Sequence, residues 1–211
     1  MAENSPTKRE PHITIRKGSP EDAEAFVNLI SLAYTPLFRA LYGIKTGDPL
    51  KNLFCLKKNY LSFEHSLFAE VDGEIAGVIM GLDWRTRQQE RMRTGLLKFR
   101  YFGGPFWLKV PYLLVNPYVP GIIGEGEYYF GHLVVYPQFR GMGLGKKLIA
   151  KEEDIARKRG AQRMVADVKV INEVMIKLVK KMGYTVSEDA KEMVIGRNRF
   201  HFYRITKDLR N

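Results

Sequence analysis

Three glycines, Gly141, Gly143 and Gly145, alternate at the end of the stretch GHLVVYPQFRGMGLG, which spans residues 131–145. A turn without side chains lets a ligand approach the main chain closely. The residues that follow have the apolar spacing of a helix, so the turn opens a helix near Gly143. The first amides of a helix lack internal partners and lie at the positive end of its dipole. The pattern therefore predicts an anion site, most simply for phosphate.

Cationic side chains strengthen this prediction. Arg140, Lys146 and Lys147 flank the helix start, where carboxylates are normally preferred. A multiply charged anion would account for them, and a solvated basic surface is the alternative. Two common phosphate loops are excluded by spacing. A Walker loop needs Ser or Thr after its lysine, and the dinucleotide fingerprint needs a different glycine spacing early in a βαβ unit.

The stretch resembles the acyl-CoA loop of the GNAT acetyltransferases, whose pattern is Arg or Gln, two residues, Gly, one residue, then Gly or Ala. Arg140, Gly143 and Gly145 match it. Downstream, Asn172 and the segment 181–184 are similar to the family's N-x-x-A-x-x-L-Y-x-x-x-G-F segment. The resemblance implies an α/β GNAT acyl-CoA N-acyltransferase fold, with a mixed, mostly antiparallel twisted sheet flanked by helices. It also implies acetyl-CoA as cofactor.

The resemblance places the cofactor along one strand and the turn. The diphosphate would rest on the amides of residues 141–146, and the pantetheine would pair with the backbone of Leu133 and Val135. The thioester would lie where this strand and the next, residues 164–170, splay apart, and the amide near Val135 would polarise its carbonyl. Asn172 would contact the cofactor or the strand edge. The predicted cofactor-binding residues are Leu133, Val134, Val135, Arg140, Gly141, Met142, Gly143, Leu144, Gly145, Lys146 and Asn172.

The acceptor amine must lose a proton before it attacks, because an amine with a pKa of about 10 is mostly charged at neutral pH. The two-residue period of a strand predicts that residues 127, 129, 131, 133 and 135 share one face, which places Glu127 and Tyr129 on the side of Val135. His132, on the other face, is predicted to pack in the core. Asp167 lies on the neighbouring strand.

The resemblance implies a base at the position of Asp167 in ribosomal-protein acetyltransferases and at that of Tyr129 in histone-type enzymes. We favour Glu127 or Asp167. The structural alternatives are a solvated strand end for Glu127 and pairing with a buried lysine or backbone amides for Asp167.

One departure from the family concerns the general acid. The tyrosine that usually protonates the leaving thiolate is replaced by Val179, and Tyr184 is predicted to fill the core. Tyr129 or water would then supply that proton. A non-catalytic acyl-CoA-binding or regulatory module is the alternative function.

Composition limits the remaining classes. The chain has 211 residues, a net charge of +11 and one cysteine, Cys55, which is predicted to be buried. These features predict a polar tail at 1–11, a single GNAT domain at 12–211, no metal site and a cytoplasmic location. Four prolines within 102–123 argue against a membrane span. The positive charge attracts anions, but no nucleic-acid-binding motif is present, so nucleic acid is an unlikely partner.

Local patterns predict the supporting elements. These are a strand at 12–16, a helix from Ser19, a helix at 49–60, a hairpin around Asp72–Gly73 and closing strands at 184–187 and 199–207. Pro36 is expected either to end the first helix or to start another segment. About forty residues, 85–125, form an insertion, basic and helical at first and then aromatic and proline-rich. We expect it to cap the site of a small-molecule or peptide amine, or else to form a homodimer interface or extra core packing.

Overall fold

The computed structural model describes residues 10–43 and 46–210. A single sheet has the strand order β1-β2-β3-β4-β5-β8-β6, and β7 pairs with β8. Only β4 and β5 run parallel among the pairs of the described chain, which confirms the mixed, mostly antiparallel sheet. The strands are β1 Ile13–Lys17, β2 Ser66–Val71, β3 Glu74–Asp83, β4 Glu127–Val135, β5 Arg163–Lys169, β6 Thr185–Val186, β7 Lys191–Ile195 and β8 Asn198–Asp208.

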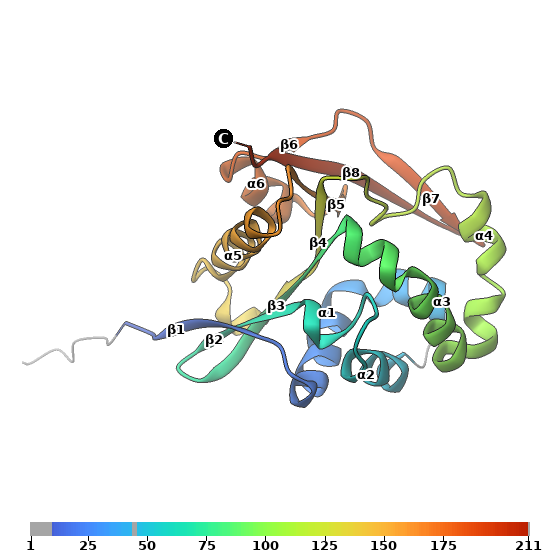
Figure 1. Cartoon of the computed structure of the whole chain (residues 1–211), viewed down its shortest axis with the longest axis horizontal. Coiled ribbons are helices and arrows are strands. Elements are labelled where there is room, and N and C mark those ends of the chain that lie inside the picture. Colours follow the sequence, from blue (N-terminus) through green and yellow to red (C-terminus); the bar gives the residue numbers. More distant parts are fainter. Residues whose placement is uncertain (1–9, 44–45, 211) are drawn as a thin grey trace, which may run out of the picture.

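Helices cover both faces of this sheet (Figure 1). On one face α5 packs on β3 and β4, whereas on the other face α1 packs on the same two strands, together with α2 and α3. Each face has its own cluster of buried apolar side chains. The helices are α1 Ala23–Tyr42, α2 Gly47–Cys55, α3 Trp84–Trp107, α4 Val110–Val115, α5 Leu144–Lys158 and α6 Glu173–Lys181.

The hairpin predicted around Asp72–Gly73 is confirmed. Asp72 and Gly73 both have positive φ, 51° and 85°, and they join β2 to β3. Two residues with positive φ form the turn whose twist matches that of an antiparallel pair. The second strand of this hairpin, β3, pairs with β4.

Two local predictions are wrong, the helix predicted at 49–60 ends instead at Cys55, and one strand was not predicted. The first helix does not end at Pro36, because α1 continues to Tyr42 with Leu37, Phe38 and Leu41 buried beyond the proline. The packing of these side chains offsets the hydrogen bond that proline removes. Cys55 is exposed at the end of α2, and β7 was missed between the two predicted closing strands.

The 85–125 insertion forms α3, α4 and an extended segment that returns to β4. Gly103, with φ 59°, interrupts the helical backbone within α3. Phe102 and Phe106 pack on Tyr42 of α1, so one side of the insertion belongs to the core. Its outer side exposes apolar residues, namely Met92, Leu96, Phe99, Trp107, Leu108, Tyr112, Leu114 and Val115.

Glu152 of α5 is a buried carboxylate, 1% exposed, which accepts a hydrogen bond of 2.6 Å from the hydroxyl of Tyr128. Burial raises the pKa of Glu152 from 4.5 to about 7, against the opposing effects of Tyr128 and Arg159. Between these pH values the folded protein holds a proton that the unfolded chain has lost. Stability therefore falls as the pH rises through this window.

We expect the free energy of unfolding of the wild type to fall by about 3 kcal/mol more than that of Glu152→Gln between about pH 5 and 8. Urea unfolding across this range measures the difference. The control is Glu173→Gln, because Glu173 pairs with Lys177 at 3.5 Å on the surface and both side chains are exposed. Parallel pH profiles for the wild type and Glu152→Gln would show that Glu152 does not carry this dependence.

Candidate active site

A β-bulge in β4 shapes the site. Val134 pairs with Val78 of β3 and Gly131 with Met80, so two residues of β4 oppose one of β3 between these pairs. His132 lies in the bulge with a φ of 51°, in the left-handed region that β-strands otherwise avoid. The extra residue reverses which side chains point to each face from that position onward.

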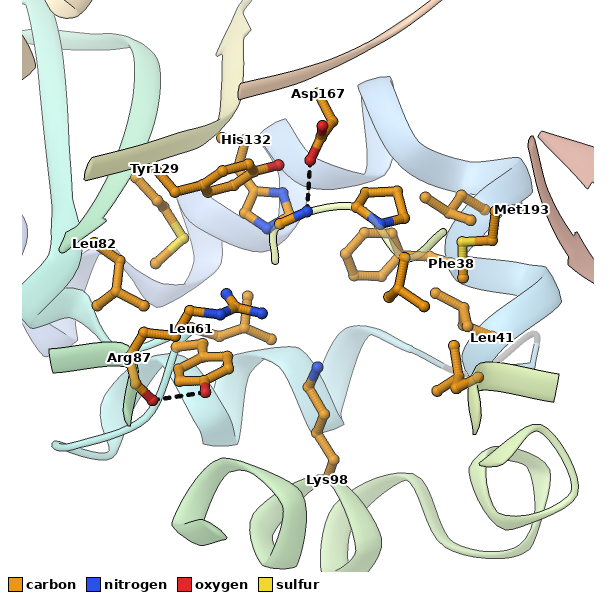
Figure 2. A pocket seen from close by; sticks show the side chains of 18 of the residues that line it. Phe38, Leu41, Leu61, Leu82, Arg87, Lys98, Tyr129, His132, Asp167 and Met193 are labelled. Carbon is orange, nitrogen blue, oxygen red and sulfur yellow. Dashed lines mark hydrogen bonds between the residues drawn. The ribbon is translucent and has the colours of Figure 1, made fainter. Parts of the chain in front are cut away.

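The predicted shared face of residues 127–135 is therefore wrong. Before the bulge, Tyr128 and Phe130 pack in the cluster below α5, and after it Leu133 and Val135 do so. Tyr129 and His132 line a cavity on the α1 and α3 side, and Tyr129 also contacts the edge of the α5-side cluster (Figure 2). His132 borders the cavity and packs against Phe38, with ring centroids 6.1 Å apart, so the prediction that it is packed is confirmed. It lies on the side of Val134, whereas Phe130 lies on the other face.

The pairing between β4 and β5 stops early, as predicted. Residues 127–129 pair with residues 163–165, and no further pair is found along these two strands in the described chain. The strands extend to Val135 and Lys169, so their later parts diverge. Backbone groups of β4 beyond the bulge are therefore left along an opening in the sheet, where an extended ligand chain can pair with them.

The glycine-rich turn precedes α5, which begins at Leu144 with Gly143 as its N-cap. Gly141 and Gly143 have φ of 84° and 75°, and a Cβ on either residue would point into open space. No side chain caps the helix and no acidic residue lies in its first turn. The amides are thus open to an anion, so the turn fits the diphosphate of CoA.

Two other predicted cofactor residues have structural contacts of their own. Asn172 is the N-cap of α6, and its side-chain oxygen accepts a hydrogen bond of 3.2 Å from the amide of Met175. The Arg140 Nε donates to the carbonyl of Val135 at 3.3 Å, which joins the turn to the end of β4. Leu144 is buried, so only its backbone faces the anion site.

The cavity has a volume of about 280 Å³. Gly131 and His132 of β4 and Asp167 of β5 belong to its wall, so it borders the diverging strands. The start of α5 lies on the opposite face of the sheet (Figure 1). The insertion contributes another part of the wall, through Arg87, Lys98, Phe106, Leu113, Val119, Pro120 and Gly121.

Asp167 is at the cavity, but its carboxylate is already satisfied. The side chain is fully buried, and Arg204 of β8 donates to it at 3.0 and 3.2 Å. The backbone amide of Gly121 donates at 2.5 Å, and the hydroxyl of Tyr118 donates as well. Its partners are thus an arginine, a tyrosine and an amide, in place of the lysine considered as one alternative. These bonds fasten the end of the insertion to β5.

Glu127 lies away from the cavity, at the start of β4. It accepts a hydrogen bond of 2.9 Å from the amide of Gly124 and lies 3.5 Å from both Arg163 and Arg204. Tyr129, two residues further along β4, does line the cavity. Of the three residues predicted for proton transfer, the structure therefore brings Tyr129 and Asp167 to the cavity, but not Glu127.

The position of the family's tyrosine is closed to solvent. Val179 is fully buried in the cluster below α5. Tyr184 is also buried there, as predicted, and its hydroxyl donates to Glu153 at 2.9 Å. Neither side chain lines the cavity.

Sequence reasoning assigned His132 to the core and did not expect it to border a cavity, and it did not anticipate Arg87 or Lys98 in the wall. Burial, with a smaller effect of Lys98, lowers the pKa of His132 from 6.5 to about 4, so the imidazole is neutral at pH 7. The signal that could have revealed its orientation is Gly131, because a glycine inside a strand often marks a bulge.

Other kinds of site find no support in the described part of the chain. No cluster of three or more His, Cys, Asp or Glu side chains there is arranged to hold a metal ion. None of its helices combines the length and the apolarity that a membrane span requires.

Comparison with known proteins identifies the family. A crystal structure of an acetyltransferase has 21% identity and a TM-score of 0.66, covering 93% of this chain and 99% of that chain. An N-acetyltransferase from Staphylococcus aureus Mu50 has 16% identity and a TM-score of 0.64, and the match covers 92% of this chain and 100% of that chain. A protein from Salmonella typhimurium, described as an acetyltransferase with its cofactor acetyl-CoA, has 20% identity and a TM-score of 0.58, covering 93% and 94%.

Identities this low show only that the fold is shared, whereas the family follows from a match between the sequence and a family model. The model of the acetyltransferase (GNAT) family matches residues 30–184, which is well over half of the chain. This range includes the bulged β4, the glycine-rich turn and α5. The chain therefore belongs to the GNAT family of acetyltransferases, and it is an N-acetyltransferase that uses acetyl-CoA as its cofactor.

Proposed function

We propose that the enzyme transfers the acetyl group directly to the primary amine of a small acceptor bound in the cavity. The observation that carries this proposal is the position of the cavity. Gly131, His132 and Asp167 in its wall belong to the two strands that diverge, and the glycine-rich turn lies on the other face of the sheet. Cofactor and acceptor can therefore approach the same opening from opposite faces.

Acetyl-CoA, when bound, supplies an acyl group that is already activated as a thioester. The chain's own contribution is to hold and orient. The amides at the start of α5 bind the phosphates, and the backbone of β4 beyond the bulge positions the pantetheine. The insertion, fastened through Asp167, caps the acceptor and excludes water from the cavity. No protein nucleophile is needed, and the exposed Cys55 is outside the cavity wall.

The proton of the amine leaves by way of Tyr129 in this proposal. Tyr129 and Asp167 both line the cavity, but the Asp167 carboxylate already accepts from Arg204, Tyr118 and Gly121. The Tyr129 ring lies beside Gly131: a Cβ built on Gly131 would be 2.9 Å from it. Its hydroxyl is thus the group best placed to relay a proton to water.

We expect Tyr129→Phe to lower kcat by about 10- to 100-fold, because a positioned proton-transfer group contributes at least that much. The affinity for CoA should stay unchanged. Two variants serve as comparisons, namely Glu127→Gln, away from the cavity, and Tyr112→Phe, an exposed tyrosine of the insertion. Steady-state kinetics with any accepted amine measures the effect. A larger loss in Glu127→Gln than in Tyr129→Phe would assign the proton transfer to Glu127.

Release of CoA thiol from acetyl-CoA tests the function itself. The purified enzyme is incubated with a panel of amino acids, simple amines, polyamines and peptides, and the acetylated products are identified by mass spectrometry. Thiol release that depends on one class of amine, with the acetyl group on its nitrogen, supports the proposal. Calorimetric binding of acetyl-CoA without turnover of any amine would instead fit a non-catalytic acyl-CoA-binding module. A homodimer through the apolar outer side of α3 and α4 stays a prediction.

A further inference from the structure

Two cationic side chains of α3 line the acceptor cavity. Arg87 and Lys98 both project into it from the insertion (Figure 2). The Arg87 guanidinium lies 4.6 Å from the ring centroid of Tyr60, and the Lys98 ammonium lies 5.6 Å from that of Tyr42. Both cations therefore rest on aromatic rings, which hold a cation in place without neutralising it.

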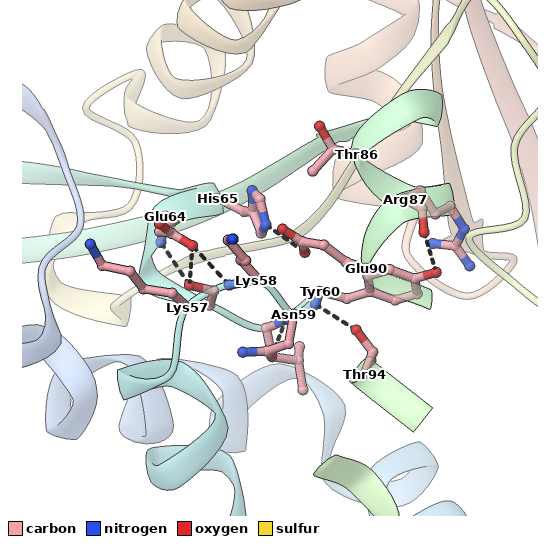
Figure 3. A network of polar contacts seen from close by, with 12 residues as sticks. Lys57, Lys58, Asn59, Tyr60, Glu64, His65, Thr86, Arg87, Glu90 and Thr94 are labelled. Atoms are coloured by element: carbon pink, nitrogen blue, oxygen red, sulfur yellow. Dashed lines mark hydrogen bonds and ion pairs between the residues drawn. The ribbon is translucent and has the colours of Figure 1, made fainter. Parts of the chain in front are cut away.

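A surrounding network fixes the position of Arg87 (Figure 3). The hydroxyl of Tyr60 donates to the Arg87 carbonyl at 2.7 Å, and the amide of Tyr60 donates to Thr94 at 3.1 Å. On the same side of α3, Glu90 is paired with His65 at 2.9 Å and both are buried. These bonds hold the backbone of Arg87 and the ring of Tyr60, on which the guanidinium rests.

The charge of these two groups is not balanced within the described chain. Arg16, Arg159 and Arg204 each have a carboxylate within 3.0 Å, and the pKa of each is raised. For Arg87 and Lys98 no ion pair is found among the described residues. Burial lowers the pKa of Arg87, and the opposing effects of Tyr60, Tyr129 and Asp167 do not offset it.

The acidic groups near Arg87 and Lys98 already form ion pairs with other residues. Asp167 is bonded to Arg204, and Glu90 to His65. The remaining titratable groups in the wall are tyrosines and histidines, of which His132 is neutral at pH 7 because its pKa is lowered to about 4. The cavity is therefore positive, and an anion that enters it gains two charge-assisted contacts.

The phosphates of CoA are not this anion. They belong to the start of α5, on the opposite face of the sheet from α3 (Figure 1). Most of the remaining wall is apolar or aromatic, with Phe38, Leu41, Met80, Leu82, Phe106 and Met193. A volume of about 280 Å³ suits a small molecule.

Building on the proposed function, we infer that the acceptor is a small amine with an apolar body and a carboxylate, as in an apolar amino acid. Arg87 and Lys98 hold the carboxylate, the apolar wall receives the body, and the amine faces Gly131 and His132 at the opening of the sheet. Polyamines and simple cationic amines are excluded by repulsion from the same two cations.

Matched pairs of probes test this inference. L-Phenylalanine is compared with phenethylamine, and L-leucine with isoamylamine, since the members of each pair differ in the carboxylate. Binding is measured by calorimetry in the presence of CoA, and turnover by thiol release. We expect each amino acid to bind at least about ten-fold more tightly than its amine and to be the better substrate. Arg87→Gln and Lys98→Gln should each remove most of this preference while the affinity for CoA stays unchanged.

Arg91→Gln is the control, because Arg91 is exposed on the same helix and does not line the cavity. Equal or tighter binding of the simple amines would overturn the inference, as would a loss of CoA affinity in Arg87→Gln. Turnover of simple amines alone would support acetyl transfer to an amine but would contradict the inference that the acceptor carries a carboxylate. Conversely, Arg87-dependent binding of the amino acids without turnover would support the carboxylate site and reject the transfer.

Discussion

Gly143→Val is expected to weaken the binding of CoA by about 100-fold or more while the protein stays folded. Gly143 is the N-cap of α5 with a φ of 75°, and its amide neighbours are open to the diphosphate. Valine disfavours this backbone conformation and places its side chain over the turn, where the phosphates would lie. The loss of two charge-assisted hydrogen bonds of about 1.5 kcal/mol each corresponds to a factor of this size.

Gly73→Val is the matched control for this variant. Gly73 also has a positive φ, 85°, and a Cβ there also points into open space, but it lies in the β2–β3 hairpin. Both variants should lose about 1 to 2 kcal/mol of stability from backbone strain, seen as a similar fall in Tm. Calorimetry then separates them, since only Gly143→Val should lose CoA. Wild-type affinity in Gly143→Val would remove the turn from the cofactor site.

Arg204→Met is expected to destabilise the protein by about 3 to 5 kcal/mol. Its guanidinium lies 3.0 Å from the Asp167 carboxylate, which is fully buried, and it also donates to the carbonyl of Ile122 at 2.8 Å. Removal of one partner of a buried ion pair leaves the other charge without compensation, and this costs far more than the pair contributes. The end of the insertion should loosen too, because Asp167 and Arg204 both hold it.

Arg199→Met provides the comparison on the same strand. Arg199 lies 3.0 Å from Glu192, the distance found for Arg204 and Asp167, but the two side chains are 67% and 36% exposed, whereas that of Asp167 is fully buried. An exposed pair contributes about 1 kcal/mol at most. Urea unfolding measures both variants, and limited proteolysis between residues 116 and 126 reports on the insertion. Equal losses in the two variants would show that burial of Asp167 does not set the cost.

The features that were predicted correctly depend on neighbours in the chain. The turn at Asp72–Gly73 and the start of α5 at Gly143–Leu144 are confirmed, and the strand predicted at 164–170 is found as β5 at Arg163–Lys169. In each case the signal is local, because glycine permits positive φ and apolar periodicity marks the buried face of one element. The helical first half of the insertion follows from the same kind of signal.

The errors arise where distant segments decide the outcome. Pro36 lies within α1 because buried residues beyond it pack on the sheet, and Cys55 is exposed because α2 ends at that residue. The bulge at His132 depends on the register of β4 against β3, and it reverses the faces that a strict two-residue period assigns.

By itself the sequence determined the glycine-rich turn before α5 and the family, since both are encoded in consecutive residues whose backbone conformation needs no distant partner. Only the tertiary structure decided which side chains line the cavity. It brought Tyr129 and His132 to the cavity and paired Asp167 with Arg204. It also placed Arg87 and Lys98 in the wall, where neither forms an ion pair with another described residue. These relations join β4, β5, β8 and α3, and such contacts across long stretches of chain leave no periodic trace in the sequence.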